Sequence, residues 1–510
     1  MTGTPRAKPG LLKSLLPGLV LCGLFYAAAV PLILSGMNKS RGATDQLNYH
    51  EPAILLLAQR GVPSGLEPDI WLSATTPLYH IMLAGAISLV GDSAHVLQLV
   101  GSVFTAGLLI AVAALCARRL DAPRPLLTAF ALTLPIAASI YVFSAGAWLL
   151  PDNAAWLMAV GVVAVSLRKS ICPAWAAFGL LAMTLLVLFR QSHLWAAAML
   201  WAAAWIGRSA SADDTEPPLR AQLLNNFGSR FGLGLVGLSV TLPAFAIVGF
   251  FAAWWGGLVA PPFQNFNAGV SPAAPAIILA QAGIIGTFFV GWLLQGIRTL
   301  ISQHRALLMS AIAIGVLAAL MPETTYDPSE GRSSGLWNLV KIAPTIGRTS
   351  LVVVALAPVG SVAITAWMIA QPWRDRWVFI AGVLGFVAAM SATSNAWVRY
   401  HEPWLLILAA VMSAGVVRTE SAAVRMSRWL GPIALAGMLA AANALSLDAG
   451  PPKDLRRLLP GQLHWPEDFP GTRSGLVTAR WPTEADLTAR GRALLEAEAA
   501  AGDSGHTPDP

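Results

Sequence analysis

The sequence predicts an all-α membrane protein that crosses the bilayer many times. Of its 510 residues, 56% are hydrophobic and only 12% are charged, whereas an ordinary soluble domain carries roughly 25% charged residues. Apolar runs of about 20 residues recur between Leu11 and Leu445, and each is long enough to cross a hydrocarbon core of roughly 30 Å as a helix. The runs are continuous rather than alternating, which argues against a β-barrel.

The first apolar run, Leu11 to Ser35, is predicted to be an uncleaved membrane span. It follows Arg6, Lys8 and Lys13, but it is longer than the core of a signal peptide, and no small-residue cleavage site ends it. We therefore expect the N-terminus in the cytoplasm and the next loop, around Asp45, on the outer face.

Short basic loops between the later apolar runs predict the orientation of the chain. Loops rich in Lys and Arg usually face the cytoplasm, and this sequence has such loops at 118–119, 168–169, 208–230, 298–305, 374–376 and 418–428. These basic loops lie on one side of the membrane only if the segment from Leu72 to Val90 does not cross it, so we predict an interfacial or re-entrant helix there. The stretch from Pro173 to Ile206 is too long for one span, and Arg190 in its middle would be costly in lipid, so an outer-facing turn is predicted at that residue.

Counted at ordinary length, the runs give about 13 spans in a membrane domain over residues 1–447. Residues 448–510 are rich in Pro, Gly, Asp and Arg and are predicted to form a polar tail on the outer side. The net charge of +7 comes mostly from the short basic loops, so it indicates orientation in a bilayer rather than nucleic-acid binding. The three cysteines lie in or beside apolar runs without CxxC spacing, so neither a disulfide framework nor a zinc site is expected.

The predicted outer loops contain acidic residues, and each of them has both a structural and a chemical interpretation. Asp45 and Glu51 follow the first span, where they either solvate a loop or act chemically. Asp152 follows Pro151, a pair that makes a good helix N-terminus and is equally a candidate for chemistry.

Two arginines at the predicted outer face are harder to explain as loop residues. Arg190, followed by Gln191, is flanked by long apolar runs, and an ionisable residue at such a place needs a partner and is by default a functional candidate. Arg399 lies with His401 in a polar turn from Asn395 to Pro403, and its alternative reading is a cation that reaches the membrane interface.

Four short motifs occur in a specific order along the chain: Asp45 with His50 and Pro52, then Thr75-Thr76-Pro77-Leu78-Tyr79, then Leu188-Phe189-Arg190-Gln191, and finally Arg399-Tyr400 before Pro403. In this order they resemble the dolichyl-phosphate-glucose-dependent α-1,2-glucosyltransferases of the N-glycan pathway. The Thr75 to Tyr79 segment and Pro151-Asp152 also resemble the lipid A aminoarabinose transferases and protein mannosyltransferases, which share the GT-C membrane glycosyltransferase fold. One departure is that the glucosyltransferases have an Asp-Glu pair ahead of their His, whereas Asp45 is followed by Gln46.

The resemblance implies an inverting enzyme that moves a sugar, with glucose favoured, from a polyprenyl phosphate to a hydroxyl of a glycan, lipid or cell-envelope acceptor on the outer face. Such a reaction needs a carboxylate to take the proton of the acceptor; Asp45 is the first choice, and Asp152 and Glu51 remain alternatives. It also needs cations at the leaving phosphate, and arginine can hold two phosphate oxygens at once. The candidates for this contact are Arg190, Arg399, Arg332, Lys341 and Arg348.

Four further residues are expected to support that chemistry: His50, Glu51, Gln191 and His401. The reaction requires no cofactor, and no ligand cluster argues for a metal, although Asp152 would suit a divalent ion. The high Ala, Gly and Arg content favours a bacterial inner membrane, with the active site on the periplasmic face.

Other functions are compatible with the same spans. A lipid or solute transporter, or flippase, would share the buried arginine, but it would more often show two halves with repeated hydropathy, which this sequence lacks. An enzyme of the same fold acting on mannose or aminoarabinose, and a non-catalytic scaffold, also remain open.

Overall fold

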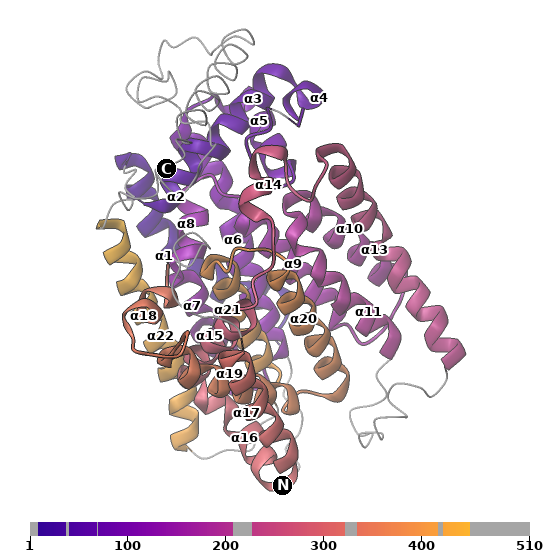
Figure 1. Ribbon diagram of the computed structural model, residues 1–510, viewed down its shortest axis with the longest axis vertical. Coiled ribbons are helices and arrows are strands. Elements are labelled where there is room, and N and C mark those ends of the chain that lie inside the picture. Colours follow the sequence, from indigo (N-terminus) through magenta and orange to yellow (C-terminus); the bar gives the residue numbers. More distant parts are fainter. Residues whose placement is uncertain are drawn as a thin grey trace, which may run out of the picture. The chain divides into compact units, whose positions relative to one another are not determined.

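The computed structural model describes residues 9–36, 40–68, 70–207, 227–321, 334–416 and 422–448. Nearly all of this part is helical, which confirms the predicted all-α class (Figure 1). The helices are α1 (Leu11–Ser35), α2 (Arg41–Asp45), the π-helix η1 (Gln46–His50), α3 (Glu51–Arg60), α4 (Val62–Gly65), α5 (Leu78–Val90), α6 (Ala94–Arg119), α7 (Pro125–Ala138), α8 (Ile140–Ala147), α9 (Asp152–Ser166), α10 (Pro173–Phe189), the 3-10 helix η2 (Gln191–Ala196), α11 (Ala197–Ile206), α13 (Phe227–Trp255), α14 (Pro261–Asn267), α15 (Ala274–Phe288), α16 (Val290–Gln303), α17 (Arg305–Leu320), α18 (Leu336–Ile342), α19 (Leu351–Ile369), α20 (Trp373–Ser391), α21 (Val398–Ala414) and α22 (Ala422–Asp448). A small antiparallel hairpin, β1 (Thr345–Ile346) with β2 (Thr349–Ser350), turns at Gly347.

Several helices have the length and apolar character of membrane spans. Within the described ranges five qualify by themselves, in α1, α6, α13, α19 and α22. Two bent pairs, α7 with α8 (69°) and α15 with α16 (107°), raise the number to seven if each pair forms one span. The chain is therefore a membrane-embedded helical protein by these criteria, while the figure of about 13 spans stays a prediction, and the expected tail lies almost entirely outside the described residues.

The loop after α1 contains short helices, as expected, but its last helix begins later than predicted. The predicted helix over Leu72 to Val90 is wrong in its first part, because α5 starts only at Leu78. Pro77 disfavours helix in the residue before it, and the Thr76 hydroxyl donates to the Val187 carbonyl at 2.6 Å rather than to a helical turn. With 13 residues, α5 is about 20 Å long, shorter than a hydrocarbon core of roughly 30 Å.

The predicted division of the apolar stretch at Arg190 is confirmed. Helix α10 ends at Phe189, and η2 and α11 follow. Arg190 contacts Asp152 at the start of α9, while Arg374 donates from Nε to the Gly207 carbonyl, after α11, and from Nη1 to the Ser166 carbonyl, at the end of α9. The chain therefore reverses direction at Arg190.

Basic residues of separate loops meet at the end of the bundle away from Asp152. Arg119 forms an ion pair with Asp375 at 3.0 Å, and its Nη2 donates to Gln371 Oε1 at 3.3 Å. Together with the two Arg374 contacts, these interactions bring the loops after α6, α9 and α11 to the start of α20, in keeping with the prediction that these loops share one side.

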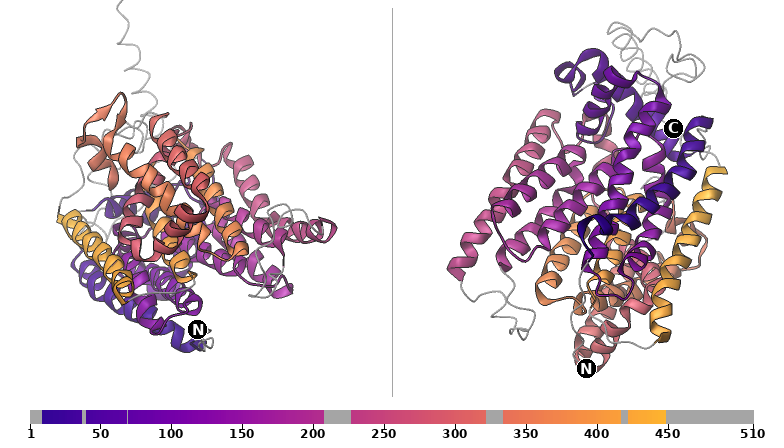
Figure 2. Two further views of the ribbon diagram at one scale, coloured as in Figure 1. Left: turned by 90° about the horizontal axis from the view of Figure 1, so that it is seen from below. Right: turned by 180° about the vertical axis from the view of Figure 1, so that it is seen from behind.

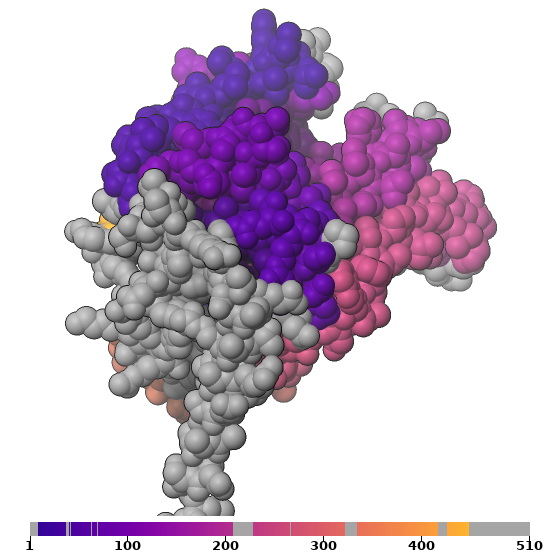
Figure 3. All heavy atoms as spheres, turned by 90° about the horizontal axis from the view of Figure 1, so that it is seen from above, coloured from indigo at the N-terminus to yellow at the C-terminus, as the bar shows by residue number. Residues whose placement is uncertain are grey.

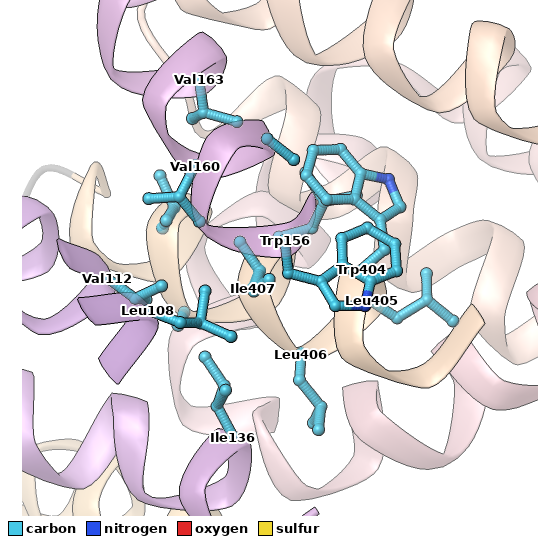
Figure 4. Close-up of a cluster of buried hydrophobic side chains, with 14 of the residues drawn as sticks. Leu108, Val112, Ile136, Trp156, Val160, Val163, Trp404, Leu405, Leu406 and Ile407 are labelled. Carbon is cyan, nitrogen blue, oxygen red and sulfur yellow. The ribbon is translucent and has the colours of Figure 1, made fainter. Parts of the chain in front are cut away.

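Helix α21 runs through the hydrophobic core and carries Arg399 in its first turn. Almost every residue from Val398 to Ala414 is buried, and Trp404, Leu406 and Ile407 pack with residues of α6, α7 and α9 (Figure 4). Because interiors pack densely, this helix is a rigid support for the residues at its start. The other views place α22 beside α1 and α7 (Figure 2).

Candidate active site

Two ion pairs join four segments that are far apart in the sequence. Asp45, the last residue of α2, pairs with Arg399 of α21. Asp152, the first residue of α9, accepts from Nη1 of Arg190 at 2.5 Å. The structure therefore brings together both predicted catalytic carboxylates and two of the predicted phosphate-binding cations.

The aromatic ring of Tyr400 connects the two ion pairs. The guanidinium carbon of Arg190 lies 4.3 Å from the ring centroid, and that of Arg399 lies 4.9 Å from it. Arg399 Nη2 also donates to the Tyr400 hydroxyl at 2.8 Å. Such cation–π contacts favour guanidinium positions close to the ring, so both pairs belong to one site.

The two pairs differ in their exposure. The side chains of Asp45 and Arg399 are 24% and 33% exposed, whereas those of Asp152 and Arg190 are 16% and 9% exposed. The Asp45 pair is thus the one that a ligand reaches more readily, and the Asp152 pair is the more buried of the two.

Close packing around α2 sets the position of Asp45. The Ser40 hydroxyl caps this short helix by accepting from the Ala43 amide at 3.1 Å. A Cβ atom added at Gly42 would lie 2.9 Å from the Trp148 ring, so only glycine lets α2 approach so closely.

Hydrogen bonds beside Asp152 anchor the start of α9. The Asn153 amide donates to Thr105 Oγ1 at 2.7 Å and to the Val142 carbonyl at 2.8 Å. The acidic first residue also suits the positive end of the helix dipole. Asp152 therefore begins α9 and also pairs with Arg190, so its position at a helix start is compatible with a place in the candidate site.

Gln191 joins two loops that are far apart in the sequence. Its Oε1 accepts from the Thr76 amide at 3.0 Å, and its Nε2 donates to the carbonyls of Ala74 and Leu258 at 2.8 and 2.9 Å. These backbone contacts occupy the amide, so Gln191 supports the site by holding the loops beside Arg190. Figure 3 looks onto this end of the molecule, where indigo and violet segments lie beside magenta and pink ones.

Glu51 belongs to a buried hydrogen-bond network next to Asp45. It accepts from Gln46 Nε2 at 2.7 Å, and Gln46 Oε1 in turn accepts from Gln98 Nε2 at 2.9 Å and from the Leu149 amide at 3.1 Å. The network ties η1 to α6 and to the segment before α9, which is a supporting role.

His50 lies within electrostatic reach of both guanidiniums. Burial and the positive charges of Arg399 and Arg190 lower the pKa of His50 to about 3. Its Nδ1 is 2.9 Å from His80 Nε2. His50 is therefore a neutral imidazole beside the two cations.

His401 does not lie at the ion pairs. It is fully buried and packs edge-on against Phe386, with ring centroids 6.0 Å apart. Two residues along a helix correspond to a rotation of about 200°, so His401 points away from the face that carries Arg399. Its expected supporting role is not supported, and its residue type alone could not have revealed this.

Of the other three predicted cations, two lie in described parts of the chain. Lys341 and Arg348 are exposed, in α18 and in the β-hairpin turn. Helix α18 packs beside the site. Its Trp337 donates from Nε1 at 2.8 Å to the carbonyl of Ala396, which lies three residues before Arg399. Arg332 lies outside the described residues.

Sequence reasoning missed three residues near the site. In the sequence Tyr400 stands out only as part of a motif, and His80 lies in an apolar stretch that carries no signal of a site. The third is Glu402, whose Oε1 accepts from the Ser139 hydroxyl at 2.7 Å. The feature of the sequence that could have revealed Glu402 is its position as an acidic residue three places beyond Arg399, in the first turns of the same helix.

Chemically, the arrangement offers two guanidiniums and two carboxylates in one place. Guanidiniums bind phosphate with strong, directed hydrogen bonds, and carboxylates accept protons. Over the parts of the chain that the structure covers, no group of three or more His, Cys, Asp or Glu side chains could hold a metal ion.

Comparisons of the chain with protein-family models, with curated proteins and with solved structures found no match.

Proposed function

We propose that this protein is a GT-C-type membrane glycosyltransferase that moves a sugar, with glucose favoured, from a polyprenyl phosphate to an acceptor hydroxyl with inversion. The observation that carries the proposal is the pair of carboxylate–guanidinium contacts around Tyr400, at one end of a membrane helical protein. Each of these residues belongs to a motif through which the sequence resembles such enzymes.

Arg190 and Arg399 would hold the phosphate of the donor. When the bond between the sugar and phosphate breaks, the phosphate keeps the electron pair and gains negative charge. Two guanidiniums that already lie side by side would stabilise the negative charge that develops on the leaving phosphate. The resemblance and the geometry agree on these two residues.

Asp45 is the preferred general base. In the step that we propose, the acceptor oxygen bonds to the anomeric carbon, its proton passes to the Asp45 carboxylate, and polyprenyl phosphate leaves from the opposite face. Asp45 is more exposed than Asp152, so an acceptor reaches it more readily. The donor phosphate would compete for Arg399 and thereby release Asp45 from its ion pair.

An apolar cavity of about 590 Å³ suits the isoprenoid chain of the donor. Its walls come from α1, α7, α8 and α22. Ala138 and Phe143 line it on either side of Ser139, whose hydroxyl donates to Glu402 in the helix that carries Arg399. A chain in this cavity would therefore extend from the neighbourhood of the site towards the lipid.

The acceptor is proposed to be a glycan, lipid or cell-envelope molecule, reached from the periplasmic side of a bacterial inner membrane. Two guanidiniums can neutralise the leaving phosphate, so the proposed reaction needs no metal. The proposed sugar transfer needs no other cofactor.

Purified protein in lipid, supplied with a panel of radiolabelled polyprenyl-phosphate sugars and a cell-lipid extract, tests the proposal. We expect the parent to consume one donor and Asp45→Asn to bind that donor without transferring its sugar. Asp92→Asn, which changes an exposed acid outside the site, is the matched control. If the parent consumes no donor, the enzyme is rejected in favour of transport; if Asp45→Asn is fully active, the base is Asp152 or Glu51.

A further inference from the structure

A pair of histidines lies beside the two ion pairs. His50 Nδ1 and His80 Nε2 are 2.9 Å apart, with nearly parallel rings. His80 belongs to α5 and is fully buried, and Trp71 packs edge-on against it with ring centroids 5.0 Å apart. Because His80 is held by packing, it can fix the orientation of the His50 ring.

The hydrogen bond to His80 leaves one nitrogen of His50 for a ligand. Nδ1 is occupied, so Nε2 is the nitrogen that remains. Since the pKa of His50 is lowered to about 3, the ring is neutral near pH 7 and carries one N–H. Whether Nε2 donates or accepts a hydrogen bond therefore depends on which histidine supplies the shared proton.

The buried side of His80 decides between the two arrangements. His80 Nδ1 has no hydrogen-bond partner among the described residues. If His80 accepted through Nε2, its Nδ1 would carry a buried N–H without an acceptor, and orphaned N–H groups are rarer than under-satisfied acceptors. If His80 donates through Nε2, its Nδ1 is a bare acceptor, and His50 then carries its hydrogen on Nε2.

We propose that His80 is a positioning residue that holds His50 as the Nε2–H tautomer, so that His50 donates a third hydrogen bond to the phosphate held by Arg190 and Arg399. This inference rests on the proposed function. An N–H beside two guanidiniums needs an anion as its acceptor; Asp45 and Asp152 contact the guanidiniums in the free protein, and the phosphate of the donor would be that anion when it binds.

The substrate chemistry gives the third donor a specific use. The donor is a phosphodiester with two non-bridging oxygens, whereas the product, polyprenyl phosphate, has three terminal oxygens and a further charge. A third hydrogen bond therefore stabilises the leaving phosphate more than the bound donor, and its loss should lower kcat more than it raises KM.

Direct binding of polyprenyl phosphate, with the uncharged polyprenol as reference, tests the inference without relying on transfer. We expect His50→Leu and His80→Leu each to weaken polyprenyl-phosphate binding about tenfold, the usual effect of one charge-assisted hydrogen bond. His50→Gln should bind nearly as the parent does, because its amide can donate from a similar position. Adding His80→Leu to His50→Gln should then change nothing, since glutamine has no tautomer to set.

Two binding results would overturn the inference alone: unchanged binding in His50→Leu and His80→Leu, or a further loss when His80→Leu is added to His50→Gln, which would mark His80 as merely structural. Nitrogen NMR of labelled histidine provides a second readout that does not depend on a variant folding, and a protonated Nδ1 in His50 would also contradict it. A parent that binds polyprenol as tightly as polyprenyl phosphate would overturn the proposed function itself.

Discussion

Tyr400 is the residue through which the two guanidiniums of the site contact the same group. It offers a ring face to Arg190 and Arg399 and a hydroxyl to Arg399. Replacement by phenylalanine removes only the hydroxyl, whereas replacement by leucine removes both kinds of contact. The two substitutions therefore separate the contribution of the ring from that of the hydrogen bond.

We expect Tyr400→Leu to lower kcat/KM for sugar transfer roughly tenfold, since a partly desolvated cation–π contact contributes about 1–2 kcal/mol. Tyr400→Phe should lose less than Tyr400→Leu. Steady-state kinetics with a labelled donor measures both variants, and Tyr26→Leu is the control at a tyrosine outside the site. Equal losses in the phenylalanine and leucine variants would show that the hydroxyl, not the ring, is what the site needs.

His50 makes the stability of this region depend on pH. The folded protein holds the pKa of His50 at about 3, whereas an unfolded histidine has a pKa of about 6.5. As the pH falls below about 6.5, the unfolded state binds a proton that the folded state does not, and unfolding becomes more favourable until about pH 3. This is the sign expected for a histidine that is neutral in the fold.

The melting temperature of the parent in detergent should therefore fall between pH 6.5 and pH 4 more steeply than that of His50→Gln, which cannot titrate there. Thermal unfolding followed at several pH values measures the difference. His304→Gln, at an exposed histidine between α16 and α17, is the control and should keep the slope of the parent. Parallel curves for the parent and His50→Gln would contradict a depressed pKa.

At the scale of secondary structure, the breaks in the helices position the site. The interruption at Arg190 follows from the cost of placing a cation within a span, and this was predictable from the sequence. The late start of α5 depends on Pro77 and on hydroxyl contacts to α10, which no local pattern reports. Local physics therefore located the break at Arg190, but neither the start of α5 nor the contacts that hold it.

The same limit applies to the candidate residues. Asp45, Asp152, Arg190 and Arg399 were recognisable because charges beside apolar runs need an explanation. Their pairing was not, because Asp45 and Arg399 are 354 residues apart and only tertiary packing decides which cation each acid meets. His401 shows the converse, since a polar residue in a site motif can face the core.

The closeness of α2 to α8 provides a test at this scale. Gly42→Ala would place a methyl group 2.9 Å from the Trp148 ring, so either α2 or this buried ring must shift, and a shift of α2 moves Asp45 with it. We expect kcat to fall about tenfold, because small misplacements of catalytic groups are costly, with little change in donor binding. Gly23→Ala, where a Cβ meets no atom within 4 Å, should leave kcat unchanged. A fully active Gly42→Ala variant would show that Asp45 tolerates displacement and is not the base.

At the scale of the whole molecule, an apolar cavity lies between the first and last described helices, α1 and α22, and borders α7 and α8. Its lining is almost entirely apolar and includes Leu24, Leu134 and Ala440. The proposed phosphate site and this cavity together fit a ligand with a charged head and a long hydrocarbon chain. The guanidiniums alone would not distinguish such a lipid from a free phosphate, and the cavity alone would not distinguish it from a bound detergent.

Filling the cavity should therefore affect long donors and spare short ones. Ala440→Trp replaces a small lining residue of α22 by a large ring, and we expect KM to rise about tenfold for a long polyprenyl-phosphate sugar, as when a few buried methylene groups are lost. A donor with two isoprene units should keep its KM, because its chain ends before the obstruction. Ala434→Trp, at an exposed position of the same helix outside the lining, controls for the larger side chain. If long and short donors respond alike to Ala440→Trp, the hydrocarbon chain binds elsewhere, and the phosphate site must then be reached from another face of the protein.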